Sequence, residues 1–89
     1  MNAIVTVVGN DKVGIIAKVS AFLADRSINI EDISQTVLSG NFVMMMMVDL
    51  AQSPKPLSEV KQELAELGDS MNVSISMMHE RVFSAMHRL

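Results

Sequence analysis

Residues 2–30 are NAIVTVVGNDKVGIIAKVSAFLADRSINI, and the pattern within them decides the fold class. The run from Asn2 to Val8 is rich in β-branched residues and apolar on both sides, which predicts a central strand. A turn is expected at Gly9–Lys12. Between Val13 and Arg26 the apolar residues recur at spacings of three and four, which predicts a helix with one buried face.

The rest of the chain supplies the remaining strands, a second helix and a tail. An alternating, polar-rich segment predicts an edge strand, and a hairpin turn separates it from a run that is apolar on both sides and therefore central. A helical stripe ended by a glycine, a half-buried strand and an amphipathic tail follow. These segments are Ile30–Leu38, Ser39–Asn41, Phe42–Leu50, Leu57–Leu67 with Gly68, Asn72–Met78 and His79–Leu89.

The order β-α-β-β-α-β predicts a ferredoxin-like α+β sandwich, in which a four-stranded antiparallel sheet carries both helices on one face. Residues 1–78 are expected to form this domain, and residues 79–89 a C-terminal helical extension. The other face then exposes Ile4, Val8 and one alternate set of residues 42–48. An apolar face of this size is expected either to pair with a second copy or to be covered by the tail helix of its own chain.

The composition excludes several classes of protein. The chain has 89 residues, 49% of them hydrophobic, a net charge of −3 and no cysteine. Without cysteine there is no disulfide framework, thiolate metal site or thiol nucleophile. The acidic balance argues against direct nucleic-acid binding, no apolar run reaches the ~18 residues of a membrane span, and the Met1 end lacks a signal-peptide pattern. We therefore expect a soluble, cytoplasmic single domain with no cofactor, membrane or nucleic-acid partner.

The turn Gly9–Ile16 and the later Ser27–Ile30 together resemble the opening of an ACT domain, and the resemblance extends over residues 2–78. The tail is similar to that of small stand-alone ACT proteins, which are similar to the ACT halves of the glycine-cleavage repressor. The resemblance implies a regulatory homodimer that binds an amino acid or similar small ligand between paired domains. It places the ligand contacts on Gly9, Asn10, Asp11, Gly14, Ile15, Asn29 and Ile30.

The chemistry of these residues suits such a site. The first turn of a helix offers unsatisfied N–H groups and a partial positive charge to a carboxylate, and Gly14 leaves that turn accessible. Asp11 could accept from an amino group, and Asn29 can donate and accept. Each residue also has a purely structural interpretation: Asp11 as a helix cap, Gly14 as a packing residue and Asn29 as a partner for turn backbone groups. The sequence departs twice from the family pattern. Val13 replaces a proline that would preset the helix start, which leaves the loop less preorganised. Asp11 replaces an asparagine, and its carboxylate repels a ligand carboxylate and favours an amine or a cation.

Other chemistry finds less support in the sequence. Met44–Met47 are expected to fill the core rather than bind a soft metal, because alternate side chains of a strand point to opposite faces. His79 and His87 are two helical turns apart, about 12 Å, too far to share a metal ion. No serine has a nucleophile context and no phosphate-binding loop is present, so we expect no enzymatic activity. The alternative to ligand binding is a protein–protein adaptor that acts through the open sheet face and the C-terminal helix.

Overall fold

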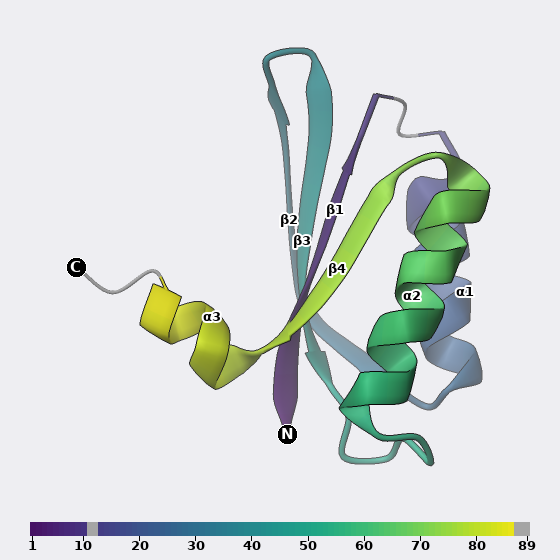
Figure 1. Cartoon of the computed structure of the whole chain (residues 1–89), viewed down its shortest axis with the longest axis vertical. Coiled ribbons are helices and arrows are strands. Elements are labelled where there is room, and N and C mark those ends of the chain that lie inside the picture. Colours follow the sequence, from purple (N-terminus) through teal and green to yellow (C-terminus); the bar gives the residue numbers. More distant parts are fainter. Residues whose placement is uncertain (11–12, 87–89) are drawn as a thin grey trace.

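The computed structural model describes residues 1–10 and 13–86 and contains the predicted order of strands and helices (Figure 1). A seventh element, α3, follows the last strand directly. The elements are β1 (Asn2–Gly9), α1 (Ile15–Asp25), β2 (Asn29–Leu38), β3 (Asn41–Asp49), α2 (Leu57–Met71), β4 (Ser74–His79) and α3 (Glu80–Met86).

The four strands form one sheet in the order β2-β3-β1-β4, and all neighbouring strands are antiparallel. The prediction that the first and third strands are central is therefore confirmed. Figure 1 shows α1 and α2 side by side on one face of this sheet. The chain has the ferredoxin-like α+β fold expected from its sequence.

The core lies between the sheet and the two helices. β3 alternates strictly, β1 sends Ala3, Val5 and Val7 into the core, and Val5 pairs with Met46 at its centre. The expectation that Ile4 is exposed on the other face is wrong, because Ile4 is only 7% exposed where α3 packs on β1 and β4. The methionine run accordingly divides: Met44 and Met46 are fully buried, whereas Met45 and Met47 point to the face without helices and are half-buried. The inward-facing residues of the two strands are Ala3, Val5, Val7, Phe42, Met44, Met46 and Val48, and the helices add Ile15, Val19, Leu23, Val60 and Leu64.

The expectation that Gly68 ends the second helix is wrong. α2 continues through Gly68 to Met71, and Asn72 takes the left-handed conformation that ends it (φ 59, ψ 39). The N–H of Asn72 donates to the carbonyl of Asp69, and that of Val73 donates to the carbonyl of Gly68. Gly68 is needed for a different reason: a Cβ there would lie 2.8 Å from the Val73 carbonyl oxygen, so the absent side chain lets α2 approach β4.

The face opposite α1 and α2 is only partly covered. The strand register shows that its outward set from β3 is Val43, Met45 and Met47. The helix α3 packs on β1 and β4 and then leads away from the sheet (Figure 1). The tail is therefore helical, as expected, but it leaves the β2–β3 half of this face open.

Candidate functional site

The turn between β1 and α1 is shaped by Gly14, which is the N-cap of α1 and has a left-handed backbone (φ 77, ψ −8). This conformation makes α1 begin at Ile15, two residues later than the expected Val13. Among the described residues, no side chain caps this helix and no acidic residue lies in its first turn. The positive end of the α1 dipole therefore lies at this point.

Gly9 lets this turn lie against the connection between α2 and β4. A Cβ on Gly9 would lie 2.5 Å from Cγ1 of Val73, the residue that connects α2 to β4. The absent side chain thus lets the end of β1 contact the α2–β4 connection. Gly9 contributes to the site by bringing these two segments together.

Two adjoining hollows lie beside the turn. The smaller, of about 230 Å³, is lined by Asn10, Val13, Ile15, Lys18, Met71, Asn72 and Val73. The larger, of about 600 Å³, shares Asn10, Asn72 and Val73 and is also lined by Gly9 and Asp69. The structure therefore gathers the sequence-predicted residues Gly9, Asn10 and Ile15, and Gly14 lies on the same turn.

Lys18, Asp69 and Asn72 are residues of this site that sequence reasoning missed. Lys18 lies four residues after Gly14, so its position in the first turn could have been inferred from helical spacing. Asp69 and Asn72 come from the C-terminal end of α2, and the close contact of Gly9 with Val73 brings them to the turn.

Asn29 and Ile30 lie at the other end of the sheet. Asn29 pairs with Asp49, which pairs with Asn2, whereas Gly9 pairs with Phe42. Seven residues of strand separate the two ends, about 23 Å. Within one chain, the six predicted ligand contacts that the structure describes therefore form two separate groups. Asp11 lies outside the described residues.

An ion-pair cluster near the C-terminal end of α1 joins the two helices. Glu63 of α2 accepts from Lys55 Nζ at 2.7 Å and from Arg26 Nε at 2.9 Å. The hydrogen bond from Lys55, followed by that from Arg26, holds the pKa of Glu63 below its ordinary value. Arg26 also lies over the ring of Phe22, 3.5 Å from its centroid. All four residues are engaged in contacts within the chain, which indicates a structural role.

The remaining polar groups offer little for metal chemistry. Within residues 1–10 and 13–86, no group of three or more His, Asp or Glu side chains is placed to hold a metal ion. His79 Nδ1 accepts a hydrogen bond from the Arg81 backbone N–H at 3.0 Å, and His87 lies outside the described residues. Across the same described part of the chain, no helix combines the length and apolar character that a membrane span needs.

Comparisons with known proteins agree with this architecture. The family model of the ACT domain matches residues 2–78. A UPF0237 protein of Listeria monocytogenes is 51% identical over 89 residues, which cover all of both chains. The structure of an ACT domain protein from Streptococcus pneumoniae is 41% identical, with a TM-score of 0.84 and 93% of each chain covered. A putative glycine cleavage system transcriptional repressor is 23% identical, with a TM-score of 0.76 over 85% of this chain and 44% of that one, a likeness that shows the fold alone. The chain therefore belongs to the ACT-domain family.

Proposed function

We propose that this protein is a non-catalytic regulatory module that binds an amino acid or a similar small ligand at an interface between two copies. ACT domains are regulatory modules that bind small ligands. The observation that carries the proposal for this chain is the hollow of about 230 Å³ beside the N-terminus of α1.

The groups around the two hollows match the two charged ends of an amino acid. The α1 N-terminus and Lys18 provide positive charge for a carboxylate, and the Asn10 and Asn72 amides can both donate and accept. Asp69 lines the adjoining hollow and offers a partner for an ammonium group. Ile15 and Val73 supply an apolar wall for a side chain.

The separation of the predicted contacts supports a site built from two chains. Gly9 and Asn29 lie about 23 Å apart along the strands of one chain, too far for one amino acid to touch both. If two β2 strands pair antiparallel about a two-fold axis, Asn29 of one copy comes to the end of the sheet where the other copy has Gly9. A ligand there would contact the turn of one copy and Asn29 of its partner.

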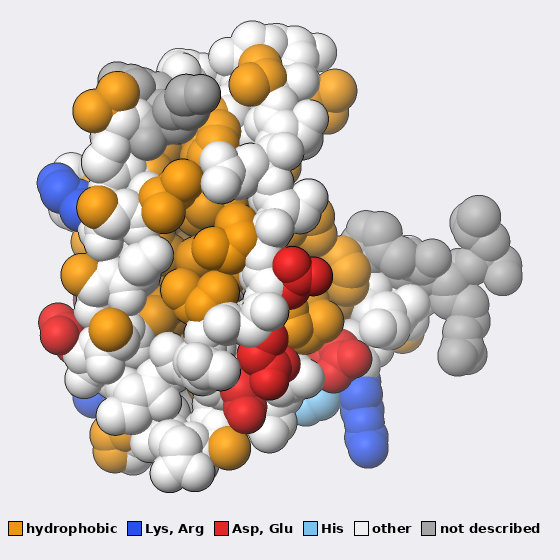
Figure 2. Space-filling model, turned by 180° about the vertical axis from the view of Figure 1, so that it is seen from behind, with side chains coloured by type: hydrophobic (Ala, Val, Ile, Leu, Met, Phe, Trp, Pro, Cys, Tyr) orange, Lys and Arg blue, Asp and Glu red, His pale blue; other side chains and the backbone are white. Residues whose placement is uncertain are grey.

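The edge strand β2 is suited to such pairing because it has a sheet neighbour on one side only. Ile33 pairs with Met46 and Val37 with Phe42, so both face the helix layer, yet they are 39% and 66% exposed. The helices of this chain stop short of β2, and a second copy would cover these residues with its own helix. Figure 2, seen from the side of α1 and β2, shows hydrophobic side chains gathered along the middle of this side.

Calorimetric titration of the protein with the common amino acids and their amines tests the proposal. We expect saturable heat for at least one compound and a higher melting temperature, since ligand at 100 times its Kd stabilises the folded state by about 2.7 kcal/mol. Lys18→Gln should weaken binding about tenfold through loss of a charged hydrogen bond, while the control Lys61→Gln on α2 should not. Neither heat nor a melting shift with any compound would refute ligand binding.

The two-chain nature of the site has its own test. Asn29→Ala should weaken binding of the same ligand although Asn29 lies at the far end of the sheet from the hollow in its own chain. Gln52→Ala, at another exposed loop position, is the matched control. If Asn29→Ala binds as tightly as the unsubstituted protein, the ligand is held by one chain and the paired arrangement is wrong.

A second candidate function, a ligand-free protein–protein adaptor, is favoured by the exposed hydrophobic residues of α3 beside the open sheet face. Deletion of residues 80–89 separates the two candidates. Loss of a bound protein with the ligand response retained would support the adaptor, and an unchanged set of bound proteins would count against it.

A further inference from the structure

The face of the sheet opposite α1 and α2 carries an open strip over β2 and β3, which is apolar on β3 and polar on β2, where the outward residues are Asp32, Ser34 and Thr36. Its outward residues on β3 are Val43, Met45 and Met47, all half-buried in the chain alone. A hollow of about 190 Å³ opens on this strip and is lined in part by Ile4, Ser34, Met45 and Met47. Methionine side chains adapt readily to an incoming surface, so the strip is suited to a packing partner.

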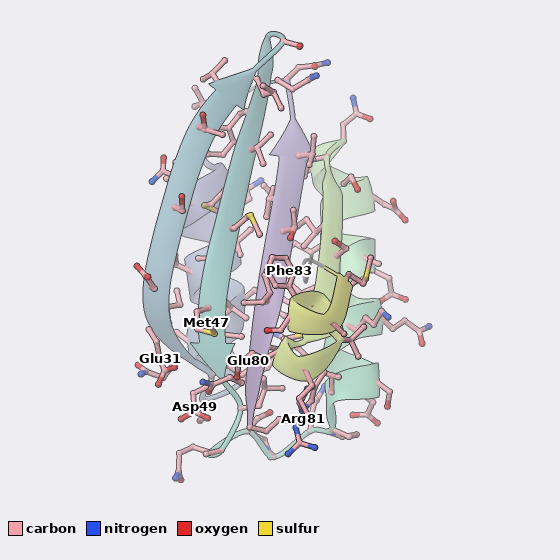
Figure 3. All side chains as sticks on the ribbon, turned by 90° about the vertical axis from the view of Figure 1, so that its left-hand side faces the viewer. Glu31, Met47, Asp49, Glu80, Arg81 and Phe83 are labelled. Atoms are coloured by element: carbon pink, nitrogen blue, oxygen red, sulfur yellow. The ribbon has the colours of Figure 1, made fainter. Side chains whose placement is uncertain are left out.

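The helix α3 stands beside this strip and exposes hydrophobic residues of its own. Phe83 is half-buried and points toward β1 (Figure 3), whereas Val82 is 50% and Met86 65% exposed. Val82 and Met86 are four residues apart and therefore share one side of the helix. A helix of seven residues is unstable alone in water, so burial of this side would stabilise it.

The chain cannot place its own α3 over β2 and β3. β4 ends at His79 and α3 begins at Glu80, so the helix starts at the sheet edge that lies opposite β2. Two strands lie between these edges, and α3 leads away from the sheet rather than across it (Figure 1). The occupant of the strip must therefore come from outside the chain.

We propose that the occupant is a second copy, and that each copy lays the Val82–Met86 side of its α3 on the open β2–β3 strip of the other. Seven helical residues rise about 10 Å, close to the distance at which two sheets pack face to face. The strip is two strands, about 10 Å, wide, which is the diameter of one helix. The arrangement is two-fold symmetric, because each copy supplies one helix and one strip.

The charges at the two surfaces are complementary. Figure 3 looks onto this face and shows Glu31 and Asp49 near the ends of β2 and β3, with Arg81 on the first turn of α3. Arg81 is exposed, and Glu31 and Asp32 are exposed beside the strip. In the proposed contact, Arg81 of one copy approaches the acidic end of the other copy's strip, which favours the pairing and its orientation.

The area that a stable interface buries indicates that α3 takes part in the contact between the two copies. Four strands of about eight residues make a flat face of about 500 Å². A stable interface buries about 800 Å² on each partner, which is about one-seventh of the 5595 Å² that the chain exposes. The sheet face alone is too small, and the exposed sides of α3 supply the remainder. This contact is separate from the β2 edge used in the proposed function and needs no ligand.

Light scattering coupled to size-exclusion chromatography measures the association. The unsubstituted protein should elute with the mass of at least two chains, and Val82→Lys with Met86→Lys should halve that mass. The matched control Ser58→Lys with Gln62→Lys places the same charges, four residues apart, on the exposed side of α2 and should leave the mass unchanged. Circular dichroism establishes that each variant is folded. A single-chain mass for the unsubstituted protein, or an unchanged mass for the α3 variant, would overturn the proposal.

Cross-linking tests the geometry directly, because the chain has no cysteine. A tagged Met45→Cys chain mixed with an untagged Met86→Cys chain should form a disulfide-linked pair of the mixed mass under mild oxidation. Ala21→Cys replaces Met86→Cys as the control and should give no such pair. Absence of the mixed pair would exclude the contact even if the protein is oligomeric. The Val82→Lys and Met86→Lys variant should still give the ligand heat expected of the α1 hollow, so failure of this contact and failure of the ligand site are distinguishable.

Discussion

Gly68→Ala is predicted to destabilise the protein, although the same change inside a helix ordinarily stabilises it. Gly68 lies within α2, where replacing glycine by alanine gains about 0.5–1 kcal/mol from helix propensity. At this position the new Cβ would lie 2.8 Å from the Val73 carbonyl oxygen and 3.0 Å from Ile75 Cγ1. The first neighbour is backbone and cannot turn aside, so α2 must move away from β4.

Two opposing contributions set the size of the effect. Forcing an extra methyl group into a packed contact costs about 1–3 kcal/mol. Subtraction of the propensity gain from the middle of that range leaves a net loss of about 1 kcal/mol in the free energy of unfolding. For a chain of this length, each kcal/mol lowers the melting temperature by about 4–8 °C.

Urea denaturation followed by circular dichroism, at one fixed protein concentration, measures this loss. The control is Ala65→Gly, which makes the reverse change at an exposed position of the same helix and should cost about 1 kcal/mol from propensity alone. If Gly68→Ala raises the midpoint or leaves it unchanged, the close approach of α2 to β4 does not depend on a missing side chain, and the reasoning is refuted.

Three further predictions follow from burial, backbone geometry and charge. Met46→Ala, at a fully buried position, should lower the free energy of unfolding by about 2–5 kcal/mol, whereas Met45→Ala on the open face should lower it clearly less. Urea midpoints of the two variants, measured under identical conditions, make the comparison. Equal losses would contradict the strand register. Gly14→Ala should lower the free energy of unfolding by about 1–2 kcal/mol, because alanine disfavours a φ of 77. Gly14→Asn should lower it less. A thermal melt in which both variants match the unsubstituted protein would contradict this prediction. Because the folded state holds the pKa of Glu63 below its ordinary value of 4.5, the stabilisation from its ion pairs should be present above that pH and be lost as the pH falls through the lowered pKa. The urea midpoint of Glu63→Gln should therefore fall below that of the unsubstituted protein near pH 6 and approach it at acidic pH; a constant difference at all pH values would contradict the assignment.

Much of the fold follows from local sequence patterns. The alternation of Ile33, Gln35 and Val37 was sufficient to assign one side of β2, and the register places all three opposite core residues of β3. The two-sided apolar runs of β1 and β3 identified the central strands. Gly68 shows the limit of such reasoning. A glycine at the end of an apolar stripe predicts a helix stop. The role of Gly68 in close packing depends instead on β4, which lies outside that stripe.

The candidate site was predictable only in part. Gly9, Asn10 and Ile15 are near one another along the chain, and the structure brings them together at one hollow. Asn29 was grouped with them because it begins the strand after α1, yet a helix of eleven residues carries the chain to the other end of the sheet before that strand begins. The distance between Asn29 and the β1–α1 turn is set by the length of the helix and the direction of the strands.

From the sequence alone, the periodicity of apolar residues determined the order of elements and the central strands, because these depend on which residues lie a few positions apart. The family resemblance was carried by the residues of Gly9–Ile16 and Ser27–Ile30. Only the tertiary structure decided which methionines enter the core and that Asp69 and Asn72 reach the β1–α1 turn. It alone also showed that α3 leaves the β2–β3 strip open. These outcomes depend on the register between strands and on the contact of Gly9 with Val73, and both are determined by segments far apart in the chain.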